Sequence, residues 1–220
     1  MNLILASASP RRAHLLRMLG VPFTVVPSGA SEALPDPVSP TDHVIEISRR
    51  KAHAVAPRYR QELVLGADTV VVLDDDIIEK PVDAEDAARM LGRLSGETHR
   101  VFTGLTLIDT GSGRCLSDVA VTEVSLRPLS DEDIRRYVQT GEPLDKAGAY
   151  AAQGRATVFI ESVKGCFYNV VGLPLACFWD LVGRVLGRSP WTLVSDHAPV
   201  PDLISSDGAG VRSARGPEDA

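Results

Sequence analysis

Residues 101–126 read VFTGLTLIDTGSGRCLSDVAVTEVSL, and this stretch decides the fold class. It contains two long runs typical of β-strands, at 101–109 and 115–126, with the turn TGSG between them. Two strands joined by so short a turn pair antiparallel. Because helices and other strands surround this hairpin without strict alternation, we expect an α/β fold with a mixed sheet.

Further strands and helices are expected on both sides of the hairpin. Apolar runs predict four other strands, at residues 3–6, 23–26, 63–73 and 157–163. N-cap residues, such as Ser9 before Pro10, mark the helix starts. The expected helices cover residues 10–19, 40–55, 83–94, 130–137 and 175–186.

Composition indicates one domain followed by a tail. The chain has 220 residues with 44% hydrophobic content, which is enough to bury one core. From about Ser189 the sequence is rich in Ser, Asp, Pro, Gly and Ala and has no periodicity. We therefore expect a domain at residues 1–188 and a flexible, low-complexity tail at residues 189–220.

Charge, cysteine content and hydropathy narrow the function classes. A formal net charge of −6 argues against a broad surface for nucleic acid. The three cysteines are far apart and odd in number, so a reducing compartment is the simpler interpretation. No apolar run approaches the roughly 18 residues of a membrane span, and the start MNLILASASP lacks the basic region of a secretory signal. We expect a cytoplasmic protein that binds neither nucleic acid nor membrane.

A first candidate site is the segment SASPRR at residues 7–12, where a strand runs into a helix. A helix N-terminus offers free backbone N–H groups and a partial positive charge. Ser7, Ser9, Arg11 and Arg12 add side-chain donors, so a phosphate group would bind well there. A capped helix with two solvated arginines explains the same residues without a ligand.

The strongest single candidate is Asp68, in the segment GADT at residues 66–69. Its carboxylate interrupts an apolar strand and needs a metal ion, a cation or a proton to compensate for burial. A strand-end aspartate bonded to nearby backbone is the structural alternative. Buried acids are seldom kept without a role, and this favours a function for Asp68.

Three lysines and a glutamate complete the candidate set. Lys51, Lys80 and Lys146 each adjoin Ala, Pro or Gly, where an ammonium group can approach a triphosphate as a point charge. Glu32 can join Asp68 as a hard oxygen ligand for Mg²⁺ or Mn²⁺. Taken singly, each of these side chains is equally consistent with a solvated surface residue.

Several common motifs are absent from the sequence. It contains no GxxxxGK loop, no GxGxxG after a strand, no HExxH and no GxSxG, which removes the usual support for nucleotide kinases, dinucleotide enzymes, zinc proteases and esterases. His99 is better explained as a structural or exposed histidine than as a site residue. The triplet Asp74 to Asp76 is better explained as a hairpin turn than as a metal cluster.

Seven segments, taken in order, resemble the Maf family of nucleotide pyrophosphatases. They lie within residues 1 to about 186 and read SASPRR at 7–12, RRKA at 49–52, GADTVV at 66–71, EKP at 79–81, SGETHRVFTG at 95–104, GEPLDKAGAYAAQG at 141–154 and NVVGLP at 169–174. The resemblance implies a single domain akin to inosine triphosphatases, with an elongated mixed sheet flanked by helices and a cleft between two lobes. It also implies a homodimer, which is frequent in the family.

The same resemblance implies an activity and roles for individual residues. Enzymes of this family hydrolyse nucleoside triphosphates to the monophosphate and pyrophosphate. Asp68 corresponds to the proton acceptor, and Arg11, Thr69 and Gln153 occupy positions associated with substrate choice. These three residue types resemble the branch that acts on dTTP and UTP, whereas the branch that acts on N7-methyl-GTP has Gln and Glu at the last two positions. A neutral amide both donates and accepts, as the edge of uracil or thymine requires.

We therefore expect a house-cleaning dTTP/UTP pyrophosphatase that uses Mg²⁺ or Mn²⁺. The metal would bridge Asp68, Glu32 and the triphosphate, while the arginines and lysines hold the anionic oxygens. One alternative is a pyrophosphatase for modified nucleotides, such as N7-methyl-GTP or methylated pyrimidines, which a nucleotide panel distinguishes. The other is a nucleotide-binding regulator of septum formation without relevant catalysis, which complementation with an inactive Asp68 variant distinguishes.

Overall fold

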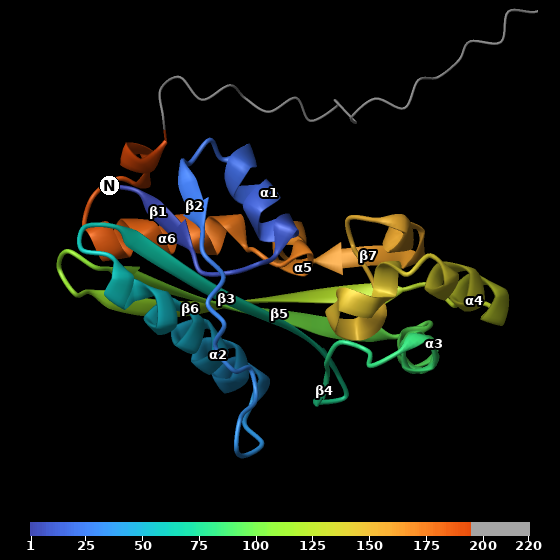
Figure 1. Cartoon of the computed structure of the whole chain (residues 1–220). Coiled ribbons are helices and arrows are strands. Elements are labelled where there is room, and N and C mark those ends of the chain that lie inside the picture. Colours follow the sequence, from blue (N-terminus) through green and yellow to red (C-terminus); the bar gives the residue numbers. More distant parts are fainter. Residues whose placement is uncertain (195–220) are drawn as a thin grey trace, which may run out of the picture.

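Strands β5 (Thr98–Asp109) and β6 (Cys115–Leu126) form the long antiparallel hairpin that the sequence predicts. In the computed structural model, which describes residues 1–194, this hairpin runs the length of the molecule (Figure 1). Strand β3 (Leu63–Leu73) pairs antiparallel with β5 from Leu63↔Asp109 to Val72↔Arg100. These three long strands form the centre of the sheet.

Shorter strands complete a seven-stranded sheet with the order β2-β1-β3-β5-β6-β7, and β4 pairs with β3. β1 (Leu3–Leu5) lies parallel to both β2 (Phe23–Val25) and β3. β4 (Asp76–Ile78) and β7 (Ile160–Lys164) are antiparallel to their partners. The prediction of a single α/β domain with a mixed sheet is confirmed.

One edge of β3 has strand neighbours at its two ends only. β1 pairs with residues 63–65, and β4 pairs with residues 71–73. Between them, residues 66–70 pair with β5 on one side, and no strand of the described chain pairs with the other side. Successive side chains of a strand point to opposite faces. At this unpaired edge, side chains from both faces of β3 can therefore reach the same region.

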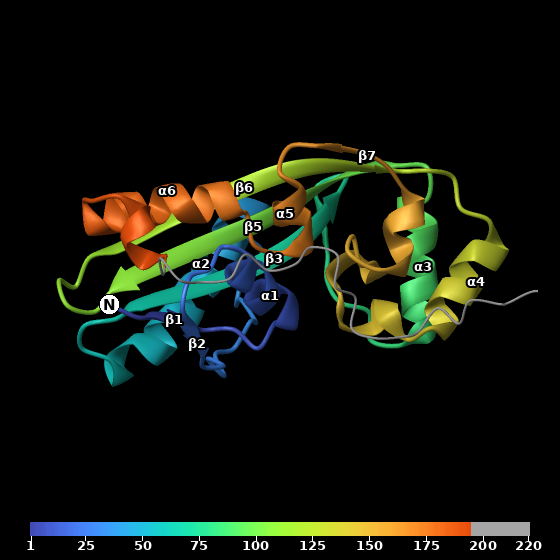
Figure 2. The same ribbon diagram turned by 90° about the horizontal axis from the view of Figure 1, so that it is seen from above.

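Within residues 1–194, six α-helices cover the two faces and one end of the sheet (Figures 1 and 2). α1 (Pro10–Met18), α5 (Phe167–Val171) and α6 (Leu175–Leu186) lie on one face, and α2 (Pro40–Val55) lies on the other. α3 (Ala84–Leu94) and α4 (Asp131–Gln139) lie at one end. The predicted caps are confirmed: each side chain accepts a hydrogen bond from the backbone N–H three residues on, at Ser9, Ser39, Asp83 and Ser130.

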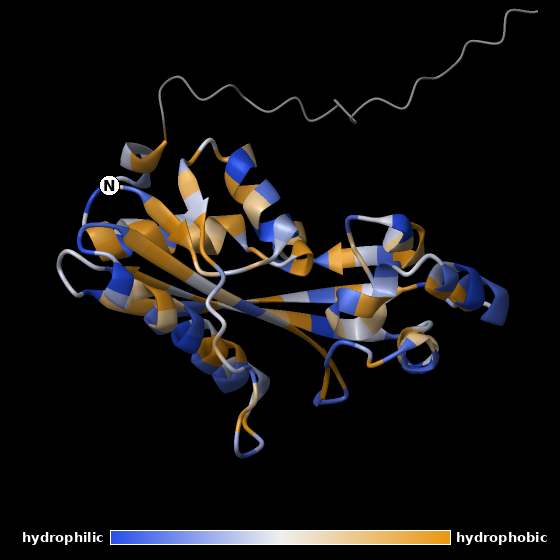
Figure 3. Ribbon diagram, in the orientation of Figure 1, coloured by the Kyte–Doolittle hydropathy of each residue, from blue (hydrophilic) through white to orange (hydrophobic). Residues whose placement is uncertain are grey.

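Two apolar cores lie on the same face of β3, one toward each end. The first joins Leu63 and Leu65 to β1, α1 and α6, and the second joins Val71 and Leu73 to α3 and α4. The strands are hydrophobic along most of their length, and the outward faces of α2 and α4 are hydrophilic (Figure 3). Thr69 lies on this face between the two cores, so the open stretch of β3 marks the boundary between two lobes.

Other parts of the structure differ from the sequence-based expectations. Residues 157–159 belong to the 3-10 helix η4 (Arg155–Phe159) and not to a strand, because the Thr157 hydroxyl donates to the carbonyls of Ala152 and Gly154. Helix α5 was not expected, since no side chain caps its start. Shorter 3-10 turns are η1 (Ala56–Arg58), η2 (Glu142–Asp145) and η3 (Ala147–Ala149).

The packed chain continues beyond the expected domain end at residue 188. The 3-10 helix η5 (Pro190–Leu193) returns to the first core, where Leu193 is buried and Trp191 packs edge-on against Trp179. Composition hides this contact because only a few apolar side chains make it, among them Trp191, Leu193 and Val194. The rest of the predicted tail, residues 195–220, lies outside the described residues. Within residues 1–194, no helix combines the length and the apolar content that crossing a membrane requires.

Two interpretations of polar residues are confirmed. His99 is 1% exposed, its Nε2 lies 2.8 Å from the Tyr150 hydroxyl, and burial lowers the pKa of its imidazole to about 4. It is therefore a neutral core residue. Asp74 and Asp75 have positive φ values of 50° and 69° and form the turn between β3 and β4.

Helix α2 packs unusually close to the sheet at two glycines. A Cβ atom at Gly66 would lie 2.1 Å from the Ser48 carbonyl oxygen, and one at Gly104 would lie 2.4 Å from the Val44 carbonyl oxygen. Because both obstacles are backbone atoms, a side chain at either position would force the helix away from the sheet. The two glycines thus fix the distance from α2 to strands β3 and β5.

We predict that Gly104→Ala destabilises the protein, by about 1–3 kcal/mol or more, because overpacking against backbone cannot relax by a rotamer change. Urea unfolding measures the effect. Gly92→Ala is the matched control: a Cβ atom at this exposed helical glycine of α3 would meet nothing within 4 Å, and alanine there should stabilise by up to about 1 kcal/mol. Equal stability of the Gly104→Ala variant and the wild type would contradict the close packing.

Candidate active site

Every residue that the sequence predicts for the site lines one pocket of about 1350 Å³, which lies beside the open stretch of β3. Its walls come from the N-terminus of α1, the loop after β2, helix α2 and the segment that follows α4. The pocket thus forms the expected cleft between two lobes. The predicted residues brought together there are Ser7, Ser9, Arg11, Arg12, Glu32, Lys51, Asp68, Thr69, Lys80, Lys146 and Gln153.

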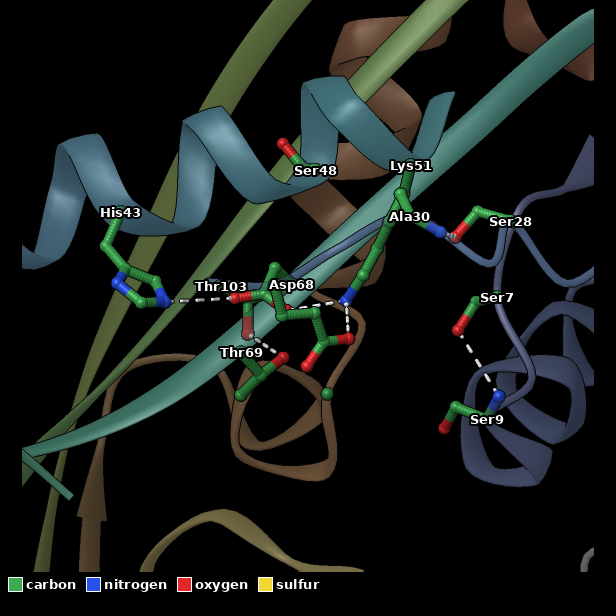
Figure 4. Close-up of polar contacts among 12 residues, drawn as sticks. Ser7, Ser9, Ser28, Ala30, His43, Ser48, Lys51, Asp68, Thr69 and Thr103 are labelled. Atoms are coloured by element: carbon green, nitrogen blue, oxygen red, sulfur yellow. Dashed lines mark hydrogen bonds and ion pairs between the residues drawn. The ribbon is translucent and has the colours of Figure 1, made fainter. Parts of the chain in front are cut away.

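Lys51 lies between two carboxylates of the pocket. Its Nζ is 2.7 Å from Asp68 Oδ1 (Figure 4). The same Nζ is 2.7 Å from Glu32 Oε1. The side chains of Lys51 and Asp68 are 9% and 10% exposed, so this pair is shielded from water. Burial alone would raise the pKa of Glu32, but the hydrogen bond from Lys51 and the charges of Lys51 and Lys80 outweigh burial and lower it. Glu32 is therefore a carboxylate that faces the pocket at neutral pH.

The second oxygen of Asp68 is free of hydrogen bonds within residues 1–194. The imidazole of His43 lies beside this oxygen, with Nε2 3.9 Å from Asp68 Oδ2. His43 was not anticipated from the sequence. Helical periodicity could have indicated it, because His43 lies two turns before Lys51 on α2 and therefore lies on the same side of the helix.

Arg12 is a buried cation held by neutral groups. Its Nε donates to the Gly172 carbonyl at 2.8 Å, Nη1 to Ser7 Oγ at 3.0 Å and Nη2 to Thr69 Oγ1 at 3.0 Å. Within the described residues it forms no salt bridge, although it is only 8% exposed, and this burial lowers its pKa. A buried charge without a counter-ion is costly, so an anion in the pocket would compensate it.

Arg11 and Arg12 have different surroundings, which the sequence did not reveal. Arg11 lies at the edge of the pocket, with Nη1 3.7 Å from Asp145 Oδ2, whereas Arg12 contacts Thr69 directly. Of the two arginines, Arg12 is therefore the one that contacts Thr69, the residue after Asp68. Family similarity pointed to Arg11 for substrate choice, and that assignment stays a prediction.

A chain of hydroxyl groups carries the Arg12 contact into the sheet. Thr69 Oγ1 lies 2.9 Å from Thr103 Oγ1, and Thr103 donates to the Asn169 carbonyl at 3.3 Å. The Asn169 amide in turn donates to the Val101 carbonyl at 2.9 Å. These contacts tie β3, β5 and α5 together behind the pocket. Neither Thr103 nor Asn169 was singled out as a site residue.

The remaining predicted residues surround the opening of the pocket. Ser9 caps α1 by accepting a hydrogen bond from the Arg12 backbone N–H, and its own backbone N–H donates to Ser7 Oγ at 3.3 Å, so the positive end of the helix lies at the pocket. Lys146 donates to the Glu142 carbonyl at 2.8 Å and pairs with Asp145. Lys80 and Gln153 are exposed on the pocket wall.

The carboxylates of the pocket suit a metal ion shared with phosphate better than one held by protein alone. Within residues 1–194, no group of three or more His, Cys, Asp or Glu side chains has the spacing of a metal site. Glu32 Oε2 is 4.0 Å from Lys80 Nζ, and Asp68 Oδ2 faces the pocket. Magnesium commonly binds through one or two carboxylates plus substrate phosphates, and the residues present fit that pattern.

These features define a class of protein. A buried arginine without a counter-ion, a helix N-terminus and several lysines suit a chain of phosphate groups, and Asp68 offers a carboxylate oxygen beside it. The fold and pocket are therefore those of an α/β protein whose pocket suits a polyphosphate beside a buried carboxylate.

The chain belongs to the family described as Maf-like protein, whose model matches residues 2–185. It is 49% identical to a dTTP/UTP pyrophosphatase of Desulforamulus reducens, over 84% of this chain and 96% of that protein. It is 50% identical to one from Symbiobacterium thermophilum, over 79% and 89% of the two chains. A relative from Escherichia coli with the same name is 47% identical, over 83% and 92%.

Among solved structures, the Ham1 protein of Staphylococcus aureus aligns with a TM-score of 0.40 and 12% sequence identity. The alignment covers 57% of this chain and 72% of that chain. A likeness of this size carries no argument about the site.

We predict that inorganic tripolyphosphate raises the thermal unfolding midpoint of the wild type and binds about ten- to a hundredfold more weakly to Arg12→Met, because charge-assisted hydrogen bonds contribute about 1.5–3 kcal/mol each. Isothermal titration calorimetry measures the affinities. Arg17→Met, on the exposed face of the same helix, should bind like the wild type. Unchanged affinity in Arg12→Met would contradict the role of this arginine.

Proposed function

We propose that this protein hydrolyses dTTP and UTP to the monophosphate and pyrophosphate, in a house-cleaning role that removes nucleotides from the precursor pool. The observation that carries the proposal is the juxtaposition, in one pocket, of Asp68, with one free carboxylate oxygen, and the buried Arg12, which forms no salt bridge within the described residues. The names of the relatives, which are 45–50% identical over most of the chain, support the same reaction.

The triphosphate would bind along the open edge of β3. Arg12 would receive anionic oxygens at the N-terminus of α1, where the helix dipole adds to its charge. Lys80 and Lys146, on other walls of the pocket, would hold the remaining phosphates and stabilise charge on the departing pyrophosphate. Positioning and electrostatics supply most of the acceleration in reactions of this type.

Asp68 would accept the proton of the attacking water at Oδ2. Lys51 holds the other oxygen at 2.7 Å, which fixes the carboxylate and leaves Oδ2 directed at the pocket. The close approach of α2 at Gly66 keeps Lys51 in place, since a longer side chain at Gly66 would push the helix outward. The chain thus prepares one carboxylate oxygen for the proton transfer.

A divalent cation, Mg²⁺ or Mn²⁺, would supply charge neutralisation at the phosphates when bound. Glu32 and Asp68 would hold it together with substrate oxygens. Lys51 already links these two carboxylates, so it would keep both oriented toward the phosphates. Glu32 has a pKa below its ordinary value, which keeps it anionic for this task.

Base preference would come from groups on the far side of the pocket. Gln153 lines the wall opposite α2 and offers an amide that can donate and accept, as the edge of uracil or thymine requires. We also propose a cytoplasmic location, which the three free cysteines support. The homodimer implied by the family resemblance stays a prediction.

In a panel of nucleotides with Mg²⁺, we predict pyrophosphate as the first product from dTTP and UTP, and slower turnover of N7-methyl-GTP. Asp68→Asn should lower kcat by about 10²–10⁴-fold, the usual contribution of a general base. Asp180→Asn, at an exposed carboxylate of α6, is the control and should be fully active. Release of single phosphate, or near wild-type turnover by a folded Asp68→Asn variant, would refute the assignment.

Removal of divalent cations should abolish turnover, because the charge of the phosphates is then not neutralised. Added Mg²⁺ or Mn²⁺ should restore turnover. Glu32→Gln should raise the metal concentration needed for half-maximal rate at least several-fold, which a titration of the chelator-treated protein measures. Glu85→Gln, an exposed glutamate on α3, should leave that concentration unchanged. Full activity without any divalent cation would exclude this role.

A further inference from the structure

His43 lies on the pocket wall beside the free oxygen of Asp68. It comes from the first turn of α2, lines the pocket, and its side chain is 14% exposed (Figure 4). Its Nε2 lies 3.9 Å from Asp68 Oδ2. Neither the sequence motifs nor the proposed function gives this histidine a task.

The separation of 3.9 Å is too long for a direct hydrogen bond between the two atoms. It is short enough for both to bond to a third atom, since an oxygen about 2.8 Å from each fits between them. That oxygen would lie at the open side of Asp68, away from Lys51, which binds the other carboxylate oxygen. The arrangement therefore defines a binding position for one water molecule.

The helix itself sets this geometry. His43 and Lys51 lie two turns apart on α2, so both reach the same carboxylate, one at each oxygen. The close contact of α2 with the sheet at Gly104 lies next to His43, at Val44, so this part of the helix lies directly against the sheet. A histidine on a helix packed this closely against the sheet is suited to positioning a small reactant.

Resting on the proposed function, we propose that His43 binds the attacking water together with Asp68. One O–H of the water donates to Asp68 Oδ2 and the other donates to His43 Nε2, which leaves an oxygen lone pair directed at the α phosphorus. The water oxygen forms a bond to that phosphorus while one proton moves to Asp68 Oδ2. The bond from the α phosphorus to the bridging oxygen breaks, and pyrophosphate leaves with the electron pair. His43 neither gains nor loses a proton in this step.

Substitutions at position 43 distinguish a water-binding role from a packing role. His43→Gln retains a terminal acceptor at about the distance of Nε2, whereas His43→Phe and His43→Leu retain bulk without one. Loss of one hydrogen bond of about 1–1.5 kcal/mol to the reacting water corresponds to about a tenfold fall in kcat. Because the water is not part of the nucleotide, the KM for dTTP should stay within about twofold of the wild-type value.

The test is steady-state pyrophosphate release from dTTP by the full-length protein and its variants, with thermal unfolding midpoints measured in parallel. We expect kcat about tenfold lower for His43→Phe and for His43→Leu, and within about threefold of the wild type for His43→Gln. His53→Phe, an exposed histidine of the same helix, is the matched control and should match the wild type.

Two results would overturn the proposal. One is a folded His43→Phe or His43→Leu variant with wild-type kcat, and the other is a His43→Gln variant as impaired as both of them. If the wild type itself released no pyrophosphate, the proposed function would fail as well. An active wild type with unaffected His43 variants would remove the water-binding role alone.

Discussion

The site depends on five residues of β3 that have a strand neighbour on one edge only. β1 and β4 are each three residues long, and the gap between them leaves residues 66–70 open. Strand alternation then sends Asp68 toward α2 and Thr69 toward α1, and both reach the same pocket. A longer β1 would fill this edge with backbone hydrogen bonds, and the N-terminus of α1 with Arg12 would lose access to Asp68.

The pocket holds charged side chains away from water, and the packing around it compensates for the cost of their burial. Arg12 is buried against neutral oxygens, and Lys51 is shared by two carboxylates. Such groups cost stability unless an anion or a cation completes them. The two apolar cores on either side of Thr69, together with the contact of α2 at Gly66 and Gly104, hold these side chains in place. The polar network is thus prepared for a ligand, which is how a binding site differs from an ordinary core.

Local signals made much of the fold and part of the site predictable. The hairpin, the capped helix starts and the anomaly of Asp68 in an apolar strand all depend on neighbours in sequence. The contacts that were missed are distant in sequence: Thr103 to Asn169, Arg12 to Gly172, and His43 to Asp68. Helix α5 was not predicted because it is short and lacks a side-chain cap. The difference between Arg11 and Arg12 depends on how α1 packs against the rest of the protein. The sequence indicated which residues could form a phosphate site, but it did not indicate which of these residues contact one another.

The most direct measurement is a crystal structure of the Asp68→Asn variant with Mg²⁺ and the α,β-imido analogue of dTTP. The account requires the phosphate chain to lie along the open edge of β3, with Arg12 on its oxygens and the α phosphorus facing residue 68. A nucleotide bound elsewhere, or one whose phosphates point away from Arg12 and residue 68, would contradict it.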